Sequence, residues 1–539
     1  MGAIRSFLAP ESIPLGAKIT RNVVFTAARS IILAPLPFLL IPYYLKKLGP
    51  AGYGTWAVFL AVNGMTSLAD FGLVTSISKH VAQHYALKDF RALGQLISTG
   101  LALYFGIACA AAGVLWASAQ IIVPALFRNS PVPLATLSIL WRFLTILVFA
   151  NIFSLSFSSI VMGLQRMDLS TGMSALNLGL SGGLSVIFLR MGLGLRGPLY
   201  GYAIAAWIVT IFYAYLVRRL LPDVQLRLAF CRWHVAREIL SFSSKAYVTQ
   251  VAVAIHNQIE KFYLAHFVGV VSVGWYDIAS DLALKLRGIP SLVLAPVMPA
   301  ASELDARNDS ARITHLYFRT HKYLALVGTP VVFYTALVAK RFVTLWVGPS
   351  YGFIGLPLSI LLAVNFFNLT TGPGFFILMG KGNLRPGLRS SIFGIVLNLT
   401  LSLFLIRAYG VQGAVIGTSV SLGLASAYFL VQYQWETKSP PLHLVRKAYL
   451  KPLVSALLIV GVLWFLGRSV HTTWVTLVAG AVVFGAAYMV LLLLFQFFDS
   501  EDLSILERVI RIPSFVRRIV PHAELGRPVL SAAARSEHD

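Results

Sequence analysis

The most evident shortage in this sequence is charge. Only 12% of its 539 residues are Asp, Glu, Lys or Arg, whereas 57% are hydrophobic, and the mean hydropathy is +0.77. Soluble domains carry about 25% charged residues, so this balance excludes an ordinary soluble fold. Uncharged stretches such as Ile31 to Leu45 and Val478 to Phe495 are typical of membrane spans. The composition therefore predicts a polytopic membrane protein.

Cysteines and catalytic motifs are also scarce. Cys109 lies in an apolar run and Cys231 in a basic loop, far apart in the sequence, which excludes a disulfide framework. The chain contains no H-E-x-x-H, no paired C-x-x-C and no Walker loop, so we expect neither a metal site nor a catalytic site nor a cofactor. The N-x-T triplets at Asn368 and Asn398 lie within apolar runs and are interpreted as chance matches.

Hydrophobic windows divide the chain into spans. Windows of about 20 apolar residues, separated by Gly, Pro or charged residues, predict an all-α fold with about 14 transmembrane helices. The helices are expected to start near Val23, Gly54, Leu96, Leu137, Met173, Pro198, Ala246, Val273, Tyr323, Ile354, Ser391, Val411, Pro452 and Thr473.

Basic residues outnumber acidic ones, 44 to 20, which gives a formal net charge of +24. Most of the Lys and Arg residues fall in the tails and in the alternate connections on the same side as the tails. The positive-inside rule therefore predicts a multi-pass protein of the bacterial inner membrane with both termini in the cytoplasm. Orientation and contact with anionic membrane lipids account for the excess charge, and no nucleic-acid partner is expected.

An internal repeat is visible in the glycine pattern. Its first part recurs at an offset of about 220 residues, from Gly49, Gly54 and Trp56 to Gly269, Gly274 and Tyr276. Its second part recurs with identical spacing about 216 residues later, from Gly194, Gly197 and Gly201 to Gly410, Gly413 and Gly417. Two six-helix halves that enter the membrane in the same sense fit these offsets, with a central cavity between them.

The repeat predicts four parts of the chain. We expect an N-terminal six-helix half at 1–220, a C-terminal six-helix half at 221–435, two extra transmembrane helices at 436–498 and a cytoplasmic amphipathic or disordered tail at 499–539.

Four basic residues are predicted at membrane depth, where an ionised group costs at least a few kcal/mol unless it faces water or a partner. They are Arg29 in the first span, Arg142 in the fourth, and Lys285 and Arg287 in the eighth. Because guanidinium and ammonium groups bind phosphates, these four are candidate cavity residues for an anionic cargo. The alternatives are snorkelling of Arg29 to the headgroups and an internal ion-pair network around Lys285 and Arg287.

Acidic residues at membrane depth are candidates for ion coupling by a proton or a sodium ion. They are Asp70, Asp277, Asp281 and Glu260. Asp277, Asp281 and Lys285 share one helical face, so that Asp281 and Lys285 can pair.

Two of these acids have a simpler interpretation. Asp70 precedes Gly72 and can instead cap a broken helix. Glu260 lies nearer the outer end of its span, where an interfacial pair with Lys261 is the alternative.

Several short segments resemble a known family. The sequence LGPAGYGTW at 48–56, followed by ADFGL at 69–73, resembles the polysaccharide transporter family of O-antigen and exopolysaccharide flippases. GLQRMD at 163–168 and VGWY at 273–276 are further marks of the family, and the resemblance covers roughly residues 15–435. The family is part of the multidrug, oligosaccharidyl-lipid and polysaccharide exporter superfamily.

The resemblance implies a cationic central cavity that takes the pyrophosphate and sugars of an undecaprenyl-linked repeat unit, with alternating access and ion coupling. The cavity residues of such flippases would correspond to Arg29, Lys285 and Arg287 in this sequence. The Glu260–Lys261 pair departs from the Asp followed by Arg or Lys of many relatives, which leaves a coupling role for this acid open.

We therefore predict a flippase, not an enzyme, that moves lipid-linked oligosaccharides across the membrane for lipopolysaccharide or exopolysaccharide biosynthesis, beside a polymerase and glycosyltransferases. A multidrug or cation antiporter of the same superfamily is the alternative, but it would favour acidic and aromatic cavity residues. A membrane polymerase or ligase would need a long outer loop, and the predicted outer connections near 125–137 and 340–353 are short.

Overall fold

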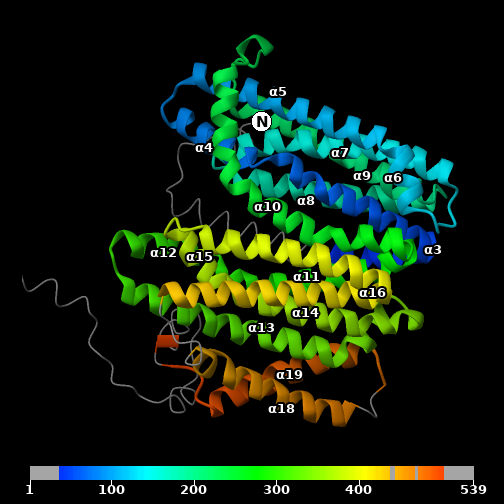
Figure 1. Ribbon diagram of the computed structural model, residues 1–539, viewed down its shortest axis with the longest axis vertical. Coiled ribbons are helices and arrows are strands. Elements are labelled where there is room, and N and C mark those ends of the chain that lie inside the picture. The colour runs from blue at the N-terminus through cyan, green and yellow to red at the C-terminus, as the bar shows by residue number, and fades with distance from the viewer. Residues whose placement is uncertain (1–34, 438–443, 468–470, 500, 503–539) are drawn as a thin grey trace, which may run out of the picture. The chain divides into compact units, whose positions relative to one another are not determined.

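The computed structural model describes residues 35–437, 444–467, 471–499 and 501–502. All regular elements in these ranges are helices, and no strand occurs among them (Figure 1). Ten described helical segments are long and apolar enough to cross a membrane, or up to eleven if the bent pair Phe38–Asp70 and Leu73–Ala86 forms one span. The predicted fold class is confirmed, whereas the count of about 14 spans is not confirmed by these segments.

The helices form two compact units. The first comprises Met1–Leu282 and Arg385–Ala425, and the second comprises Ala283–Leu384 and Ser426–Asp539. This grouping follows packing, not internal symmetry, so the division at 220, 435 and 498 stays a prediction. Two long helices, α11 (Val270–Ser291) and α16 (Arg385–Thr437), contribute residues to both units.

The first unit is built mainly from long helices of which α7, α8 and α9 pack side by side (Figure 1). Its elements, besides its parts of α11 and α16, are α3 (Pro35–Gly64), η1 (Met65–Asp70), α4 (Leu73–Ala86), α5 (Phe90–Ala117), α6 (Ala119–Leu126), α7 (Leu134–Gly163), α8 (Met167–Arg190), α9 (Arg196–Leu220), η2 (Leu228–Phe230) and α10 (Trp233–Phe267).

The second unit packs the long helix α13 against α14 and against the C-terminal helices α18 and α19 (Figure 1). Its elements, besides its parts of α11 and α16, are η3 (Leu292–Leu294), α12 (Val297–Ala306), α13 (Ser310–Trp346), η4 (Pro349–Ile354), α14 (Gly355–Leu369), α15 (Gly372–Gly380), η5 (Val445–Tyr449), α18 (Leu450–Leu466) and α19 (Trp474–Leu494).

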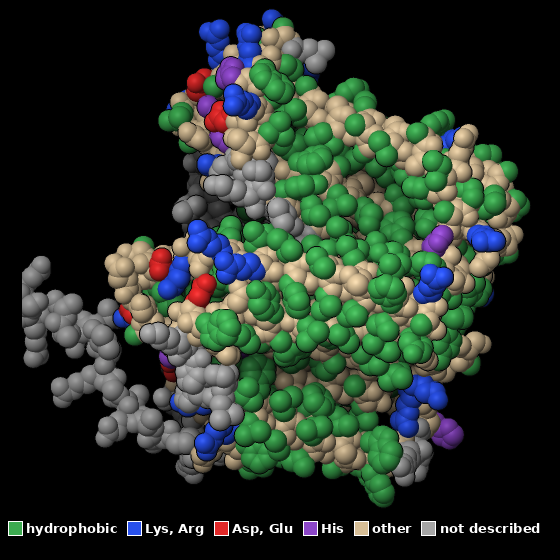
Figure 2. Space-filling model, viewed as in Figure 1, with side chains coloured by type: hydrophobic (Ala, Val, Ile, Leu, Met, Phe, Trp, Pro, Cys, Tyr) green, Lys and Arg blue, Asp and Glu red, His purple; other side chains and the backbone are tan. Residues whose placement is uncertain are grey.

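Hydrophobic side chains cover most of the visible surface, and charged side chains gather toward the ends of the helices (Figure 2). On the C-terminal helices, for example, Phe465 and Val475 are 70% and 76% exposed. Exposing such an apolar surface to water is unfavourable, whereas an apolar surface matches the hydrocarbon core of a bilayer. The distribution of side chains therefore agrees with a multi-pass membrane protein.

Two of the repeated glycines break long helices. Gly49 interrupts α3 with φ 69° and ψ 174°, and Gly410 interrupts α16 with φ 58° and ψ −129°. These backbone angles carry a high cost for residues with a Cβ atom, so glycine is required at both points. The breaks lie between spans that the sequence predicts as separate, near Gly54 and Val411.

Two other repeated glycines face each other in the first unit. A Cβ atom on Gly54 of α3 would lie 1.8 Å from the carbonyl oxygen of Val270, and one on Gly274 of α11 would lie 3.3 Å from the Cα atom of Gly54. Small residues allow helix backbones to approach closely in a membrane, where packing replaces the hydrophobic effect. The repeat thus supplies the close contact between α3 and α11.

Basic side chains of α13 bind the acidic residues that follow α19. Arg319 forms ion pairs with Glu501 and with Asp502 at 2.9 Å, and Lys322 pairs with Asp499 at 2.9 Å. Burial would raise the pKa of Asp499, but hydrogen bonds from Lys322 and from the backbone of Asp502, with the two cationic charges, lower it to about 2. Asp499 is therefore ionised at neutral pH, and these pairs fasten the segment after α19 to α13.

The glycine contact generates a prediction. Gly54→Ala should lower the midpoint of thermal unfolding of the purified protein in detergent, because the added methyl group meets a backbone oxygen and overpacking costs about 1–3 kcal/mol. Gly106→Ala on α5 is the matched control, since no atom lies within 4 Å of the added Cβ atom. Equal midpoints for the two variants would contradict the close approach of α3 and α11.

Candidate functional site

Lys261 and Asp277 form a buried ion pair in the first unit. The Lys261 Nζ atom lies 2.6 Å from Oδ1 of Asp277, and the Tyr53 hydroxyl donates a hydrogen bond of 2.7 Å to Oδ2. The two charged side chains are only 10% and 8% exposed. Helices α10, α11 and α3 each supply one member, so the three side chains tie these helices together beside the Gly54–Gly274 contact.

This arrangement gives Asp277 a structural role, because both of its oxygens already accept contacts from protein side chains. Asp281 lies one turn further along α11 and is half-buried, whereas Lys285 is exposed. Ion coupling through Asp277 or Asp281, and a pair between Asp281 and Lys285, stay predictions.

Glu260 is fully buried in the first unit and lies in a network of neutral groups. Its Oε1 atom accepts hydrogen bonds of 2.7 Å from Asn398 Nδ2 and from the Thr418 hydroxyl. The Tyr276 hydroxyl lies 2.9 Å from that of Thr418 and must be the donor there, since Thr418 donates to Glu260. Within the described part of the chain, Glu260 Oε2 and Asn398 Oδ1 make no hydrogen bond.

The position of Glu260 corrects one of the sequence alternatives. An interfacial pair with Lys261 is wrong, because Lys261 pairs with Asp277 and Glu260 is 0% exposed. The two residues are consecutive on α10 and therefore point in different directions around the helix. A buried carboxylate with one unsatisfied oxygen is costly, and a proton or a bound cation would relieve that cost.

Arg287 belongs to the second unit and is held by amides. Its Nη2 atom donates a hydrogen bond of 2.8 Å to Asn368 Oδ1, and Nη1 donates one of 3.4 Å to Asn365 Oδ1. The Asn368 amide is oriented in turn by a 2.9 Å bond to Ser426. Arg287 forms no salt bridge among the residues that the structure describes. Its positive charge is thus positioned but not neutralised.

Asp70 caps the broken helix between η1 and α4. Its Oδ1 atom accepts the backbone N–H of Val74 at 3.1 Å and the Tyr104 hydroxyl at 2.5 Å. Phe71 and Gly72 at the break have φ values of 48° and 75°. The capping alternative is the arrangement that the structure has, and a role of Asp70 in ion coupling stays a prediction.

Two predicted site residues remain, Arg142 and Arg29, and the structure describes the first of them. Arg142 is half-buried near the start of α7, with its guanidinium carbon 5.4 Å from the ring centre of Trp116 on α5. It belongs to the first unit, whereas Lys285 and Arg287 belong to the second. Arg29 lies outside the described residues.

A cavity of about 430 Å³ with both polar and apolar lining, here named the amide pocket, lies in the first unit. None of its described lining residues is charged. They are Asn63, Thr66, Leu147, Asn151, Ser154, Leu155, Ser158, Met173, Ser174, Asn177, Leu178, Ser181, Tyr202, Val209 and Tyr213.

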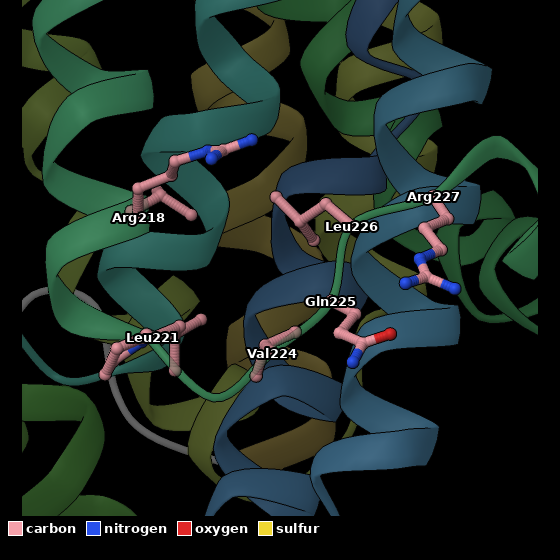
Figure 3. Close-up of a pocket in the computed structure, with 8 residues that line it drawn as sticks. Arg218, Leu221, Val224, Gln225, Leu226 and Arg227 are labelled. Atoms are coloured by element: carbon pink, nitrogen blue, oxygen red, sulfur yellow. The ribbon is translucent and has the colours of Figure 1, made fainter.

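A second pocket, of about 470 Å³, lies where α9 continues into the following loop. Arg218 projects from α9 and Arg227 from the loop, and the pocket is also lined by Leu221, Val224, Gln225 and Leu226 (Figure 3). Both arginines are exposed, and none of the predicted site residues lines this pocket. It is a basic surface feature of the connection between α9 and α10.

Sequence reasoning missed the neutral partners of the charged groups. No sequence motif marks Asn365, Thr418 or the amide pocket. The sequence analysis interprets Asn368 and Asn398 only as parts of chance N-x-T triplets. The available signal was the presence of amide side chains within apolar runs, because an unsatisfied amide is costly in hydrocarbon. No group of three metal-ligating side chains occurs within the residues that were described.

Comparisons with known proteins agree with this architecture. The model of the family described as polysaccharide biosynthesis protein matches residues 19–305. An O-antigen transporter candidate from Shigella flexneri is 22% identical, over 70% of this chain and 88% of its own length. The probable low-salt glycan biosynthesis flippase Agl15 from Haloferax volcanii is 19% identical, over 75% of this chain and 81% of its own length.

Solved transporter structures share the fold. The lipid II flippase MurJ in an inward closed conformation matches with a TM-score of 0.68 at 13% identity, over 88% of this chain and 98% of that one. An inward-facing multidrug resistance transporter of the MATE family matches with a TM-score of 0.60 at 17% identity, over 77% of this chain and 98% of that one. These likenesses show the fold of this chain.

The buried ion pair generates a prediction. Lys261→Met should lower stability by about 3–5 kcal/mol, because it leaves Asp277 charged and unpaired in the interior, and adding Asp277→Asn should recover most of the loss. Thermal or denaturant-induced unfolding in detergent measures the stability of both variants.

Lys381→Met is the matched control, since its pair with Asp305 is longer, at 3.6 Å, and partly exposed. Such a pair contributes about 0–1 kcal/mol. A double variant as unstable as Lys261→Met alone would show that the charge of Asp277 is not what the lysine offsets.

Proposed function

The chain belongs to the polysaccharide biosynthesis protein family, and on that basis we propose that it translocates undecaprenyl-pyrophosphate-linked oligosaccharide repeat units across the bacterial inner membrane. The names of its relatives, an O-antigen transporter and a glycan biosynthesis flippase, support this proposal. The protein alternates between inward and outward access with both termini in the cytoplasm. It is a transporter that acts after the glycosyltransferases that build the repeat unit and before the polymerase that consumes it.

The observation that carries the proposal is Arg287. A guanidinium that is positioned by Asn365 and Asn368, and that no described carboxylate pairs with, suits a diphosphate, which accepts paired hydrogen bonds from arginine. Lys285, two residues earlier and exposed, adds a second cation on the same helix. Arg29 and Arg142 are further proposed cargo ligands, and the guanidinium of Arg142 already rests on the Trp116 ring.

Glu260 is the proposed coupling acid. Its second oxygen and that of Asn398 are both buried and unsatisfied within the described part of the chain, so a proton or a sodium ion would complete the network. Asp70, Asp277 and Asp281 are weaker proposals for the same role, because Oδ1 of Asp70 caps a helix and both oxygens of Asp277 already accept a hydrogen bond or an ion pair.

A multidrug or cation antiporter is the rival function, since the MATE transporters share the fold. A cationic drug would be repelled by an unneutralised arginine at membrane depth, and this argument favours an anionic cargo over the rival.

Surface polysaccharide display tests the proposal. Deletion of the gene should abolish display of the surface polysaccharide and leave lipid-linked repeat units on the cytoplasmic side of the membrane. Arg287→Ala should restore display at least about tenfold less well than wild type, because it removes charge-assisted hydrogen bonds to the cargo, and Arg287→Lys should restore it in part. Arg307→Ala is the matched control, because this arginine forms an exposed pair with Glu303.

Membrane levels of each variant are checked by immunoblot, so that loss of display is separated from loss of protein. Unchanged display after deletion, together with raised sensitivity to cationic drugs, would replace the flippase proposal with the antiporter.

A further inference from the structure

The middle parts of α7 and α8 line the amide pocket. Asn151 stands about midway along α7 and Asn177 about midway along α8. The polar lining residues of α7, at 151, 154 and 158, are spaced three and four apart, as are those of α8, at 174, 177 and 181, so each helix turns a row of polar side chains toward the cavity. Polar faces at this depth are costly in a membrane unless water or a ligand meets them.

The hydrogen-bonding groups of the pocket are only partly used. Asn151 donates one bond of 2.7 Å to Asn63, which leaves its second N–H and its carbonyl oxygen. Ser174 donates to a carbonyl of its own helix and so keeps its lone pairs as acceptors, whereas Ser181 donates to its own helix and is also a hydrogen-bond partner of Tyr202.

Two further groups have no partner in the described part of the chain. The Asn177 amide and the Ser154 hydroxyl both line the cavity and make no hydrogen bond among the described residues. The pocket therefore offers donors and acceptors in similar number, which is the pattern that hydroxyl groups match, because each hydroxyl donates once and accepts twice.

The absence of charge among the described lining residues restricts the ligand. Among these residues a phosphate would find no cation, and a cationic drug would find no acid. A polyprenyl chain would leave the amides unsatisfied. A neutral molecule rich in hydroxyl groups needs neither a cation nor an acid, and it can form hydrogen bonds with the amides.

We propose that the amide pocket binds sugar residues of the lipid-linked cargo, in addition to the arginine proposed for its diphosphate. This inference rests on the proposed function and assigns a second site to it. The volume of about 430 Å³ lies in the range of small-ligand pockets. Tyr202 and Tyr213 on the wall contribute aromatic rings against which the apolar face of a sugar ring packs.

Binding to two lipids tests the site in the purified full chain. The probes are undecaprenyl pyrophosphate, which has no sugar, and the lipid-linked oligosaccharide extracted from cells that lack the gene. Wild type should bind the second more tightly. The double variant Ser154→Ala/Asn177→Ala should bind the oligosaccharide at least about tenfold more weakly, because it removes two hydrogen-bonding groups, and bind undecaprenyl pyrophosphate within about twofold of wild type.

Ser156→Ala is the matched control. Ser156 lies between Ser154 and Ser158 on α7 but is buried, donates to the Phe153 carbonyl and does not line the pocket. Its replacement should leave both affinities unchanged. Asn177→Ser, which keeps a hydroxyl group and changes the packing least, should give an intermediate affinity and replaces the double variant if that protein does not fold.

Each outcome decides the inference. Equal weakening for both lipids, or unchanged affinity for both, would overturn the sugar site and leave the flippase proposal standing. Wild-type protein that binds neither lipid would instead overturn the proposed function, and the sugar site with it.

Discussion

The cost of placing ionised groups in a low-dielectric interior is the constraint on which this structure depends. Lys261, Asp277 and Tyr53 meet it by satisfying one another at the contact between α3, α10 and α11. The contact is possible because Gly54 and Gly274 let the backbones of α3 and α11 approach. An ion pair of this kind adds little net stability over apolar packing, but it penalises every arrangement that separates its members. It therefore fixes the register of three helices.

Groups that are not satisfied in this way stand out against that background. Among the residues that the structure describes, Arg287 contacts neutral amides, Oε2 of Glu260 has no hydrogen bond, and the amide pocket has unused donors and acceptors. These three sites suit three ligands of different charge: an anionic diphosphate at Arg287, a coupling cation at Glu260 and a neutral glycan in the amide pocket. In the proposed transport cycle, different residues therefore recognise the lipid diphosphate and the sugars.

The sequence was sufficient to predict the class of fold and much less of the site. Apolar runs and repeated glycines predicted the helices and the breaks near Gly49 and Gly410, because both follow from local composition and backbone angles. The pairing of Lys261 with Asp277, and not with Glu260, depends on the rotation of α10 against α11, which no single-helix pattern contains. Asn365, Asn398 and Asn177 were missed because an amide within an apolar run has no motif until its partner is known.

Translocation by the purified chain in proteoliposomes tests the central claim most directly. Vesicles carry the lipid-linked oligosaccharide in both leaflets, a membrane-impermeant glycosidase first removes the outer pool, and the return of cleavable glycan to the outer leaflet is followed over time. We expect the pool to be replenished with wild-type protein, and far more slowly with Arg287→Ala or in protein-free vesicles. Replenishment no faster with inserted wild-type protein than in protein-free vesicles would contradict the account.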